Sequence, residues 1–145
     1  MDWTACKKKD MVKEIKRDDN LISSLLSSSE KKLKSNELLP LDDTTASSKL
    51  TLVYDALREI LEALAIAKGF KIYNHECYCA FLNEIMREDR LSKKFDDFRK
   101  LRNAVNYYGK DIKADETKSV LEAMFKLIKQ VKGILNSMRK GSKNN

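Results

Sequence analysis

The residues best suited to chemistry lie in one stretch of the chain, 98–110. This stretch holds an arginine, two amides and a phenol: Arg102, Asn103, Asn106 and Tyr107. A guanidinium binds phosphate through a planar pair of donors, while amides and aromatic rings hydrogen-bond to a base or stack on it. Together these groups predict a nucleotide- or RNA-binding site. The alternative is structural, with Arg102 lying along the edge of a helical bundle and the tyrosines packing with exposed polar tips.

A second cluster of reactive side chains contains His75, Cys77 and Cys79. Zinc requires three or four ligands on a tetrahedron, and only Cys6 remains as a further soft ligand. Residues two apart on a helix point away from each other, so Cys77 and Cys79 could not both bind one ion. We therefore expect no metal and no cofactor. We expect His75 at a helix start and one of the cysteines in the core.

The sequence shows no arrangement typical of an enzyme active site. Its acidic pairs are adjacent residues, at 18–19, 42–43 and 96–97, and neighbours on a helix do not share a face. There is no glycine-rich phosphate loop, and no serine has a recognisable base partner because His75 is the one histidine. We therefore assign no catalytic residue.

Length and composition limit the class of protein. The 145 residues suit one domain, and only 4 Gly and 1 Pro argue against an all-β fold with many tight turns. No apolar stretch is long enough to cross a membrane, and the first ten residues lack a secretory signal pattern. Three cysteines are too few for a disulfide framework, which favours a reducing cytoplasm.

The net charge of +7 is concentrated at the two ends. The first 17 residues hold six Lys or Arg and three acidic residues, and the residues after Glu122 hold six Lys or Arg and no acid. Such ends keep a protein soluble, or fold back together into a surface that attracts phosphate. We expect residues 1–8 and 140–145 to be flexible basic ends around a single domain over 9–139.

Five helices are expected to position these residues. Apolar residues recur every three or four positions in five segments: 11–33, 50–64, 75–85, 92–108 and 115–138. Residues 18–20 can cap a fresh helix start, Asn74 can cap another, and Gly69 ends the segment 50–64, which we expect at the centre. No strand pattern is visible. The predicted fold class is all-α, an up-and-down antiparallel bundle of about five helices.

The sequence Arg-Asn-x-x-x-Tyr-Tyr-Gly at 102–109 resembles the HEPN family, the higher eukaryotes and prokaryotes nucleotide-binding domain. The long central helix, the Tyr-Asn-His-Glu start at 73–76 and the final amphipathic helix match the order of its elements over roughly residues 10–138. The resemblance implies a helical bundle that forms a homodimer through the motif helix, here 92–108. Many members are metal-independent ribonucleases, often toxins paired with a nucleotidyltransferase-like antitoxin. Others are inactive partners or nucleotide-binding modules.

The chain departs from the family at the nuclease histidine. The family motif has an arginine, a polar residue and then a histidine after four to six intervening residues, and Arg102 with Asn103 matches its first two members. Residues 107–109, where the histidine should fall, are two tyrosines and a glycine. A tyrosine with a pKa of about 10 moves protons poorly at neutral pH. His75 belongs to a different helix start and is not a natural substitute, though a dimer partner could bring it nearer.

We therefore expect a cytoplasmic HEPN-like homodimer that binds nucleotide or RNA and cuts RNA slowly or not at all. A nucleotidyltransferase-like protein is a candidate partner. Four apolar residues on one face of the helix 92–108 also favour a dimer: Phe95, Phe98, Val105 and Tyr108. The alternatives are a metal-independent ribonuclease with an altered site and a structural scaffold without ligand.

Overall fold

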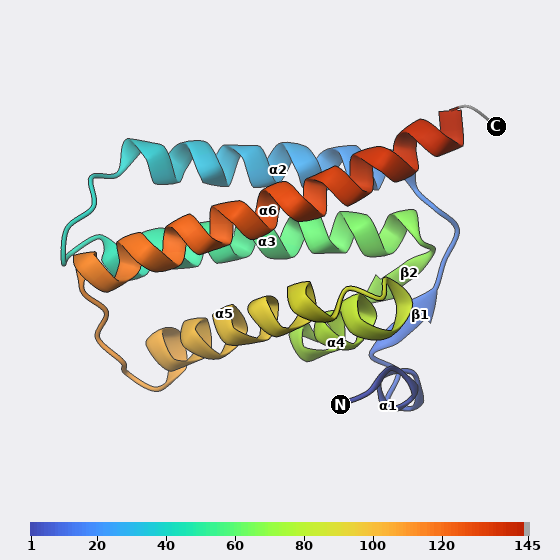
Figure 1. The fold of residues 1–145 in the computed structure, drawn as a ribbon, viewed down its shortest axis with the longest axis horizontal. Helices are drawn as coiled ribbons and strands as arrows, with labels where there is room; N and C mark the ends of the chain where they lie inside the picture. The colour runs from blue at the N-terminus through green and yellow to red at the C-terminus, as the bar shows by residue number, and fades with distance from the viewer. Residues whose placement is uncertain (144–145) are drawn as a thin grey trace.

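The computed structural model describes residues 1–143, and most of them are helical (Figure 1). In chain order the elements are α1 Trp3–Lys8, β1 Val12–Glu14, α2 Asp19–Leu38, α3 Ala46–Ala67, β2 Phe70–Ile72, α4 His75–Ala80, the π-helical turn η1 Phe81–Ile85, α5 Asp89–Tyr107 and α6 Ala114–Lys143. Apart from one small sheet, the predicted all-α class is confirmed. None of the described helices is both long and apolar enough to cross a lipid bilayer.

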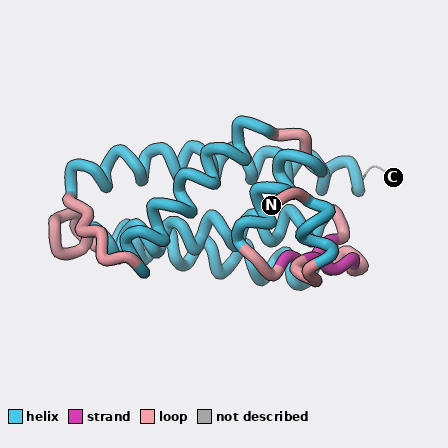
Figure 2. The backbone as a smooth tube through the Cα atoms, turned by 90° about the horizontal axis from the view of Figure 1, so that it is seen from below, coloured by secondary structure: helices cyan, strands magenta, loops and turns pink. Residues whose placement is uncertain are grey.

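Helix α3 lies at the centre of the structure, as its apolar pattern predicts. It buries 15 of its 22 residues and packs against α2, α6 and α5. Consecutive long helices run in opposite directions, and the loops that join α2 to α3 and α5 to α6 lie at one end of the molecule (Figures 1 and 2). The two strands lie toward the other end.

Local signals in the sequence fix several helix ends. The carboxylate of Asp18 accepts a hydrogen bond from the backbone N–H of Leu21 at 3.0 Å, and the side chain of Asn74 accepts one from Glu76 N–H at 2.8 Å. Both are N-caps, as predicted. Gly69 follows α3 with a φ of +91°, a conformation that favours glycine.

A two-stranded antiparallel sheet corrects the expectation that the chain has no strand. Strand β1 pairs with β2 so that Val12 lies opposite Ile72. Each strand has three residues, which is too short for alternating burial to stand out in a sequence. Next to the sheet, Tyr73 N–H donates a further hydrogen bond to the carbonyl of Met11, at 2.8 Å. It thereby fixes the chain directly before α4.

The first eight residues are ordered, although the sequence analysis predicted a flexible end. They form α1, which Asp2 caps by accepting a hydrogen bond from Ala5 N–H at 2.8 Å. Trp3 is buried, with its ring centroid 5.1 Å from that of Phe70 and 6.0 Å from that of Phe81. This packing orders the segment. At the other end, α6 extends to Lys143 and so runs into the segment 140–145 that was predicted to be flexible; residues 144–145 lie outside the described residues.

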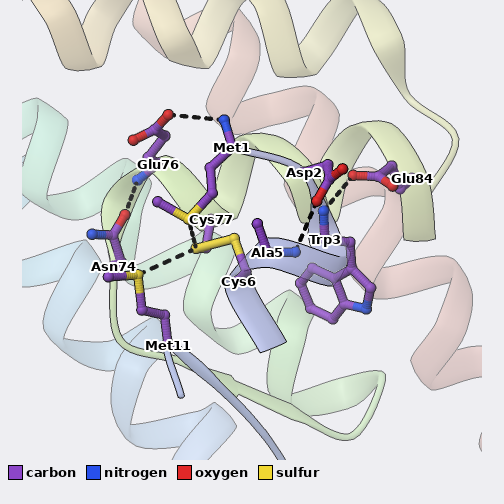
Figure 3. The surroundings of a disulfide bond; sticks show 10 residues. All are labelled: Met1, Asp2, Trp3, Ala5, Cys6, Met11, Asn74, Glu76, Cys77 and Glu84. Carbon is purple, nitrogen blue, oxygen red and sulfur yellow. Dashed lines mark hydrogen bonds and ion pairs between the residues drawn. A yellow bond between two sulfur atoms is a disulfide. The ribbon is translucent and has the colours of Figure 1, made fainter. Parts of the chain in front are cut away.

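A disulfide joins Cys6 in α1 to Cys77 in α4 (Figure 3). The cysteine count therefore no longer supports a reducing compartment, because disulfides persist in oxidising surroundings. The count was misleading because one pair suffices to fasten a short terminal helix to the domain. Cys79 is free, and its Sγ lies 3.6 Å from Oδ1 of Asp96.

Candidate functional site

A pocket of about 380 Å³ lies between the start of α4 and the C-terminal half of α5. One wall is the continuous segment 73–76, which follows β2 and begins α4. The other wall is one face of α5 and consists of Arg99, Arg102, Asn103 and Tyr107. These four residues share a face because they are spaced by three or four along the helix. Three of the four predicted ligand residues therefore line one pocket.

Asn106, the fourth predicted ligand residue, does not line the pocket. Its Oδ1 accepts a hydrogen bond from the hydroxyl of Thr51 on α3, at 3.2 Å. Asn106 follows Arg102 by four positions and so lies on nearly the same face of α5, but its side chain bonds to Thr51 instead of lining the pocket. Its role in the structure is to connect α5 to α3.

Arg102 is held against two aromatic rings. Its guanidinium carbon lies 5.1 Å from the ring centroid of Tyr54 and 5.2 Å from that of Tyr107. Its Nη1 donates a hydrogen bond to Oδ1 of Asn103 at 3.2 Å, and its buried Nε has no hydrogen-bond partner in the structure. Rings on a guanidinium fix its plane without neutralising its charge.

The second arginine of the pocket is neutralised by an acid. Nη2 and Nε of Arg99 lie 2.7 and 3.1 Å from Oδ1 of Asp96. Within the part of the chain that the structure describes, Arg102 has no such ion pair. Arg102 is therefore the cation that the pocket offers to an anion.

His75 lies in the same pocket as Arg102 within one chain, so no dimer partner is needed to bring the two together. Its Nδ1 lies 3.0 Å from the hydroxyl of Tyr54. Burial, together with the charges of Arg102, Arg58 and Arg99, lowers the pKa of His75 to about 4. The imidazole is therefore neutral at pH 7.

Tyr54 is the functional residue that the sequence analysis missed. It falls in the apolar pattern of α3 and is fully buried, yet it contacts both Arg102 and His75. Burial raises the pKa of its hydroxyl above the ordinary value, so the phenol keeps its proton. The sequence did contain one indication of this role: a tyrosine stands where the pattern of a buried helix expects an aliphatic residue. A buried tyrosine hydroxyl needs a hydrogen-bond partner.

His75, Cys77 and Cys79 are close in the sequence but do not form a single group in the structure. Cys77 is bonded to Cys6, and His75 is paired with Tyr54. No three His, Cys, Asp or Glu side chains among the described residues are placed to hold a metal ion together. Comparison of the chain with protein-family models and with characterised proteins finds no match. Functional inference therefore depends on the pocket itself and on the resemblance in its α5 residues.

Proposed function

We propose that the chain is a HEPN-like module that binds nucleotide or RNA in the pocket between α4 and α5, with little or no nuclease activity. The geometry of Arg102 carries this proposal. Its guanidinium is fixed by Tyr54 and Tyr107, partly buried, and without a carboxylate in the described chain. An oriented and unneutralised guanidinium favours a phosphate, which accepts two parallel hydrogen bonds from it.

The surroundings of Arg102 suit the rest of a nucleotide. Tyr73 and Tyr107 line the pocket and are 57% and 65% exposed, so both rings are available for stacking on a base. Asn74 and Asn103 supply amide groups at the same pocket. The volume of about 380 Å³ falls within the range of small-molecule sites.

A metal-independent ribonuclease remains the second candidate, because the structure places an imidazole beside Arg102. A histidine with a pKa of about 4 is neutral at pH 7 but accepts a proton only weakly. The hydroxyl of Tyr54, which bonds to Nδ1 of His75, has a raised pKa and does not deliver a proton readily. These two groups support binding over efficient cleavage.

The proposal includes a homodimer through the helix 92–108, on the basis of the resemblance. Phe95 and Phe98, which the sequence suggested as contacts, are buried within the single chain. The other two suggested contacts remain available to a partner: Val105 is half-buried, and Tyr108, which directly follows α5, is 82% exposed. A nucleotidyltransferase-like partner and a cytoplasmic location rest on the resemblance alone.

The proposal is tested by fluorescence anisotropy with a fluorescein-labelled, short single-stranded RNA. The variant Arg102→Lys keeps the charge but loses the planar pair of donors, so we expect binding about tenfold weaker, which corresponds to about 1.4 kcal/mol. Lys94→Ala is the matched control, because it removes an exposed charge from the same helix outside the pocket. Its affinity should change less than about twofold, which is the scale of one screened surface charge.

Unchanged affinity in Arg102→Lys together with a loss in Lys94→Ala would show non-specific attraction to a basic protein and would contradict the proposal. Rapid RNA cleavage without metal, abolished in His75→Gln, would instead establish the ribonuclease candidate.

A further inference from the structure

The disulfide lies directly next to the pocket in the chain. Residues 73–76 form one wall of the pocket, and Cys77 is the next residue. Its partner Cys6 belongs to α1, a helix of six residues at the start of the chain. Figure 3 shows Asn74 and Glu76 of the wall beside the bond.

The N-terminal segment holds this wall at both ends. At the far end, Tyr73 N–H donates a hydrogen bond to the carbonyl of Met11 at 2.8 Å. At the near end, the Cys6 sulfur is bonded to Cys77. The two points are coupled, because Met11 N–H donates to the carbonyl of Cys6 at 3.0 Å. A displacement of α1 would therefore be transmitted to both ends of the wall.

Noncovalent contacts also hold α1 and the residue before it in place, including an ion pair at 3.1 Å between the Met1 ammonium and Oε1 of Glu76 in the wall (Figure 3). Trp3 packs on Phe70 and Phe81, and its backbone N–H donates to Oε2 of Glu84 at 2.6 Å. A helix of this length is not stable by itself in water, because isolated helices shorter than about 12 residues are marginal. The disulfide is thus a principal support of α1.

We propose that the Cys6–Cys77 disulfide is a redox clasp that holds the 73–76 wall in the conformation that binds ligand. This inference rests on the proposed function of the pocket. A dithiol reductant opens the clasp: its two sulfurs become a disulfide, the Cys6–Cys77 bond takes up two electrons, and each cysteine sulfur gains one proton. Opening releases the 73–76 wall while α5, the opposite wall, keeps its place.

The surroundings of the disulfide determine how a reductant reaches it. Both cysteines are fully buried, and the sulfurs of Met1 and Met11 lie 3.9 and 4.0 Å from that of Cys77. A reductant therefore reaches the bond only when α1 frays. Burial raises the pKa of the Cys79 thiol to about 12, which leaves it protonated and a poor nucleophile toward the neighbouring disulfide.

Hydrogen–deuterium exchange of the oxidised and the phosphine-reduced protein, paired with anisotropy of the labelled single-stranded RNA, tests the clasp. Reduction should speed exchange at residues 73–77 and leave 99–107 unchanged, and it should weaken RNA binding at least about fivefold. Cys6→Ser should reproduce the reduced state without reductant. Cys79→Ser is the matched control, because it removes a cysteine but keeps the clasp, and it should respond to reduction as the natural chain does.

Three results would overturn the clasp: unchanged exchange at 73–77 after the bond is broken, equal acceleration in both walls, or equal RNA affinity in the two redox states. Circular dichroism confirms that the reduced protein keeps its helices, and reoxidation should restore both readouts. If neither state binds RNA, the proposed function fails, and exchange alone decides whether the bond holds the wall.

Discussion

The imidazole of His75 should titrate far below the ordinary range of a histidine. Burial, followed by the charges of Arg102, Arg58 and Arg99, lowers its pKa from 6.5 to about 4. The chain has one histidine, so a single imidazole signal reports this value in NMR spectra recorded against pH. The pKa therefore reports first how deeply His75 is buried and second how close the arginines lie to it.

The lowered pKa makes the stability of the fold depend on pH. As the pH falls, the unfolded chain takes up a proton near pH 6.5, whereas the folded chain resists until about pH 4. The stabilisation is thus fully present above pH 6.5 and is lost as the pH falls toward 4. The full shift corresponds to about 3 kcal/mol, and solvent screening of a half-buried ring reduces this to about 1 kcal/mol.

Urea unfolding at pH 7 and pH 5 measures this loss. His75→Gln cannot titrate but can still bond to Tyr54, and pH 5 is still above the folded pKa, so the natural chain should lose about 0.5 kcal/mol more than this variant between the two pH values. Arg102→Met should raise the pKa of His75 because it removes the largest of the charge effects that lower this pKa. Arg90→Met, on an exposed position of α5 outside the pocket, should leave it unchanged.

A pKa of His75 close to 6.5 would refute this description of the pocket. It would also be refuted if the natural chain and His75→Gln lost equal stability between the two pH values, or if Arg102→Met left the pKa of His75 unchanged.

Three further outcomes are expected. Gly133→Ala should stabilise the protein by up to about 1 kcal/mol in thermal unfolding, because a Cβ there meets nothing within 4 Å; a lower melting temperature would contradict this. Lys32→Met should cost about 3 kcal/mol in urea unfolding, because it leaves the buried carboxylate of Glu59 without its ion pair. Adding Glu59→Leu should recover much of that loss, and no recovery would contradict a desolvation cost. Light scattering should give twice the 16.7 kDa mass of one chain, and a monomer mass at every concentration would exclude the dimer through 92–108.

The helical part of the fold could be predicted because its signals are local. The spacing of apolar residues in α3, the cap at Asn74 and the glycine at 69 each act within a few residues of the chain. The sheet and α1 could not be predicted in the same way. They depend on contacts between distant segments, such as Trp3 with Phe81 and Cys6 with Cys77.

The α5 wall of the candidate site was also a local pattern, and Arg102, Asn103 and Tyr107 all line the pocket. Asn106 was misplaced because its hydrogen bond to Thr51 forms only when α5 packs against α3, and no local pattern shows this contact. The opposite wall required the tertiary structure. No sequence pattern relates Tyr54 to His75, whose contact forms only when α3 and α4 pack.

The most direct test of the pocket as a ligand site is the NMR signal of His75 during titration with short single-stranded RNA. A bound phosphate at Arg102 changes the charge beside the imidazole, so the signal should shift to saturation in the natural chain. Arg102→Lys should reach saturation only at a higher RNA concentration, in proportion to its weaker affinity. RNA binding in the natural chain that leaves the His75 signal unmoved would contradict a site between α4 and α5.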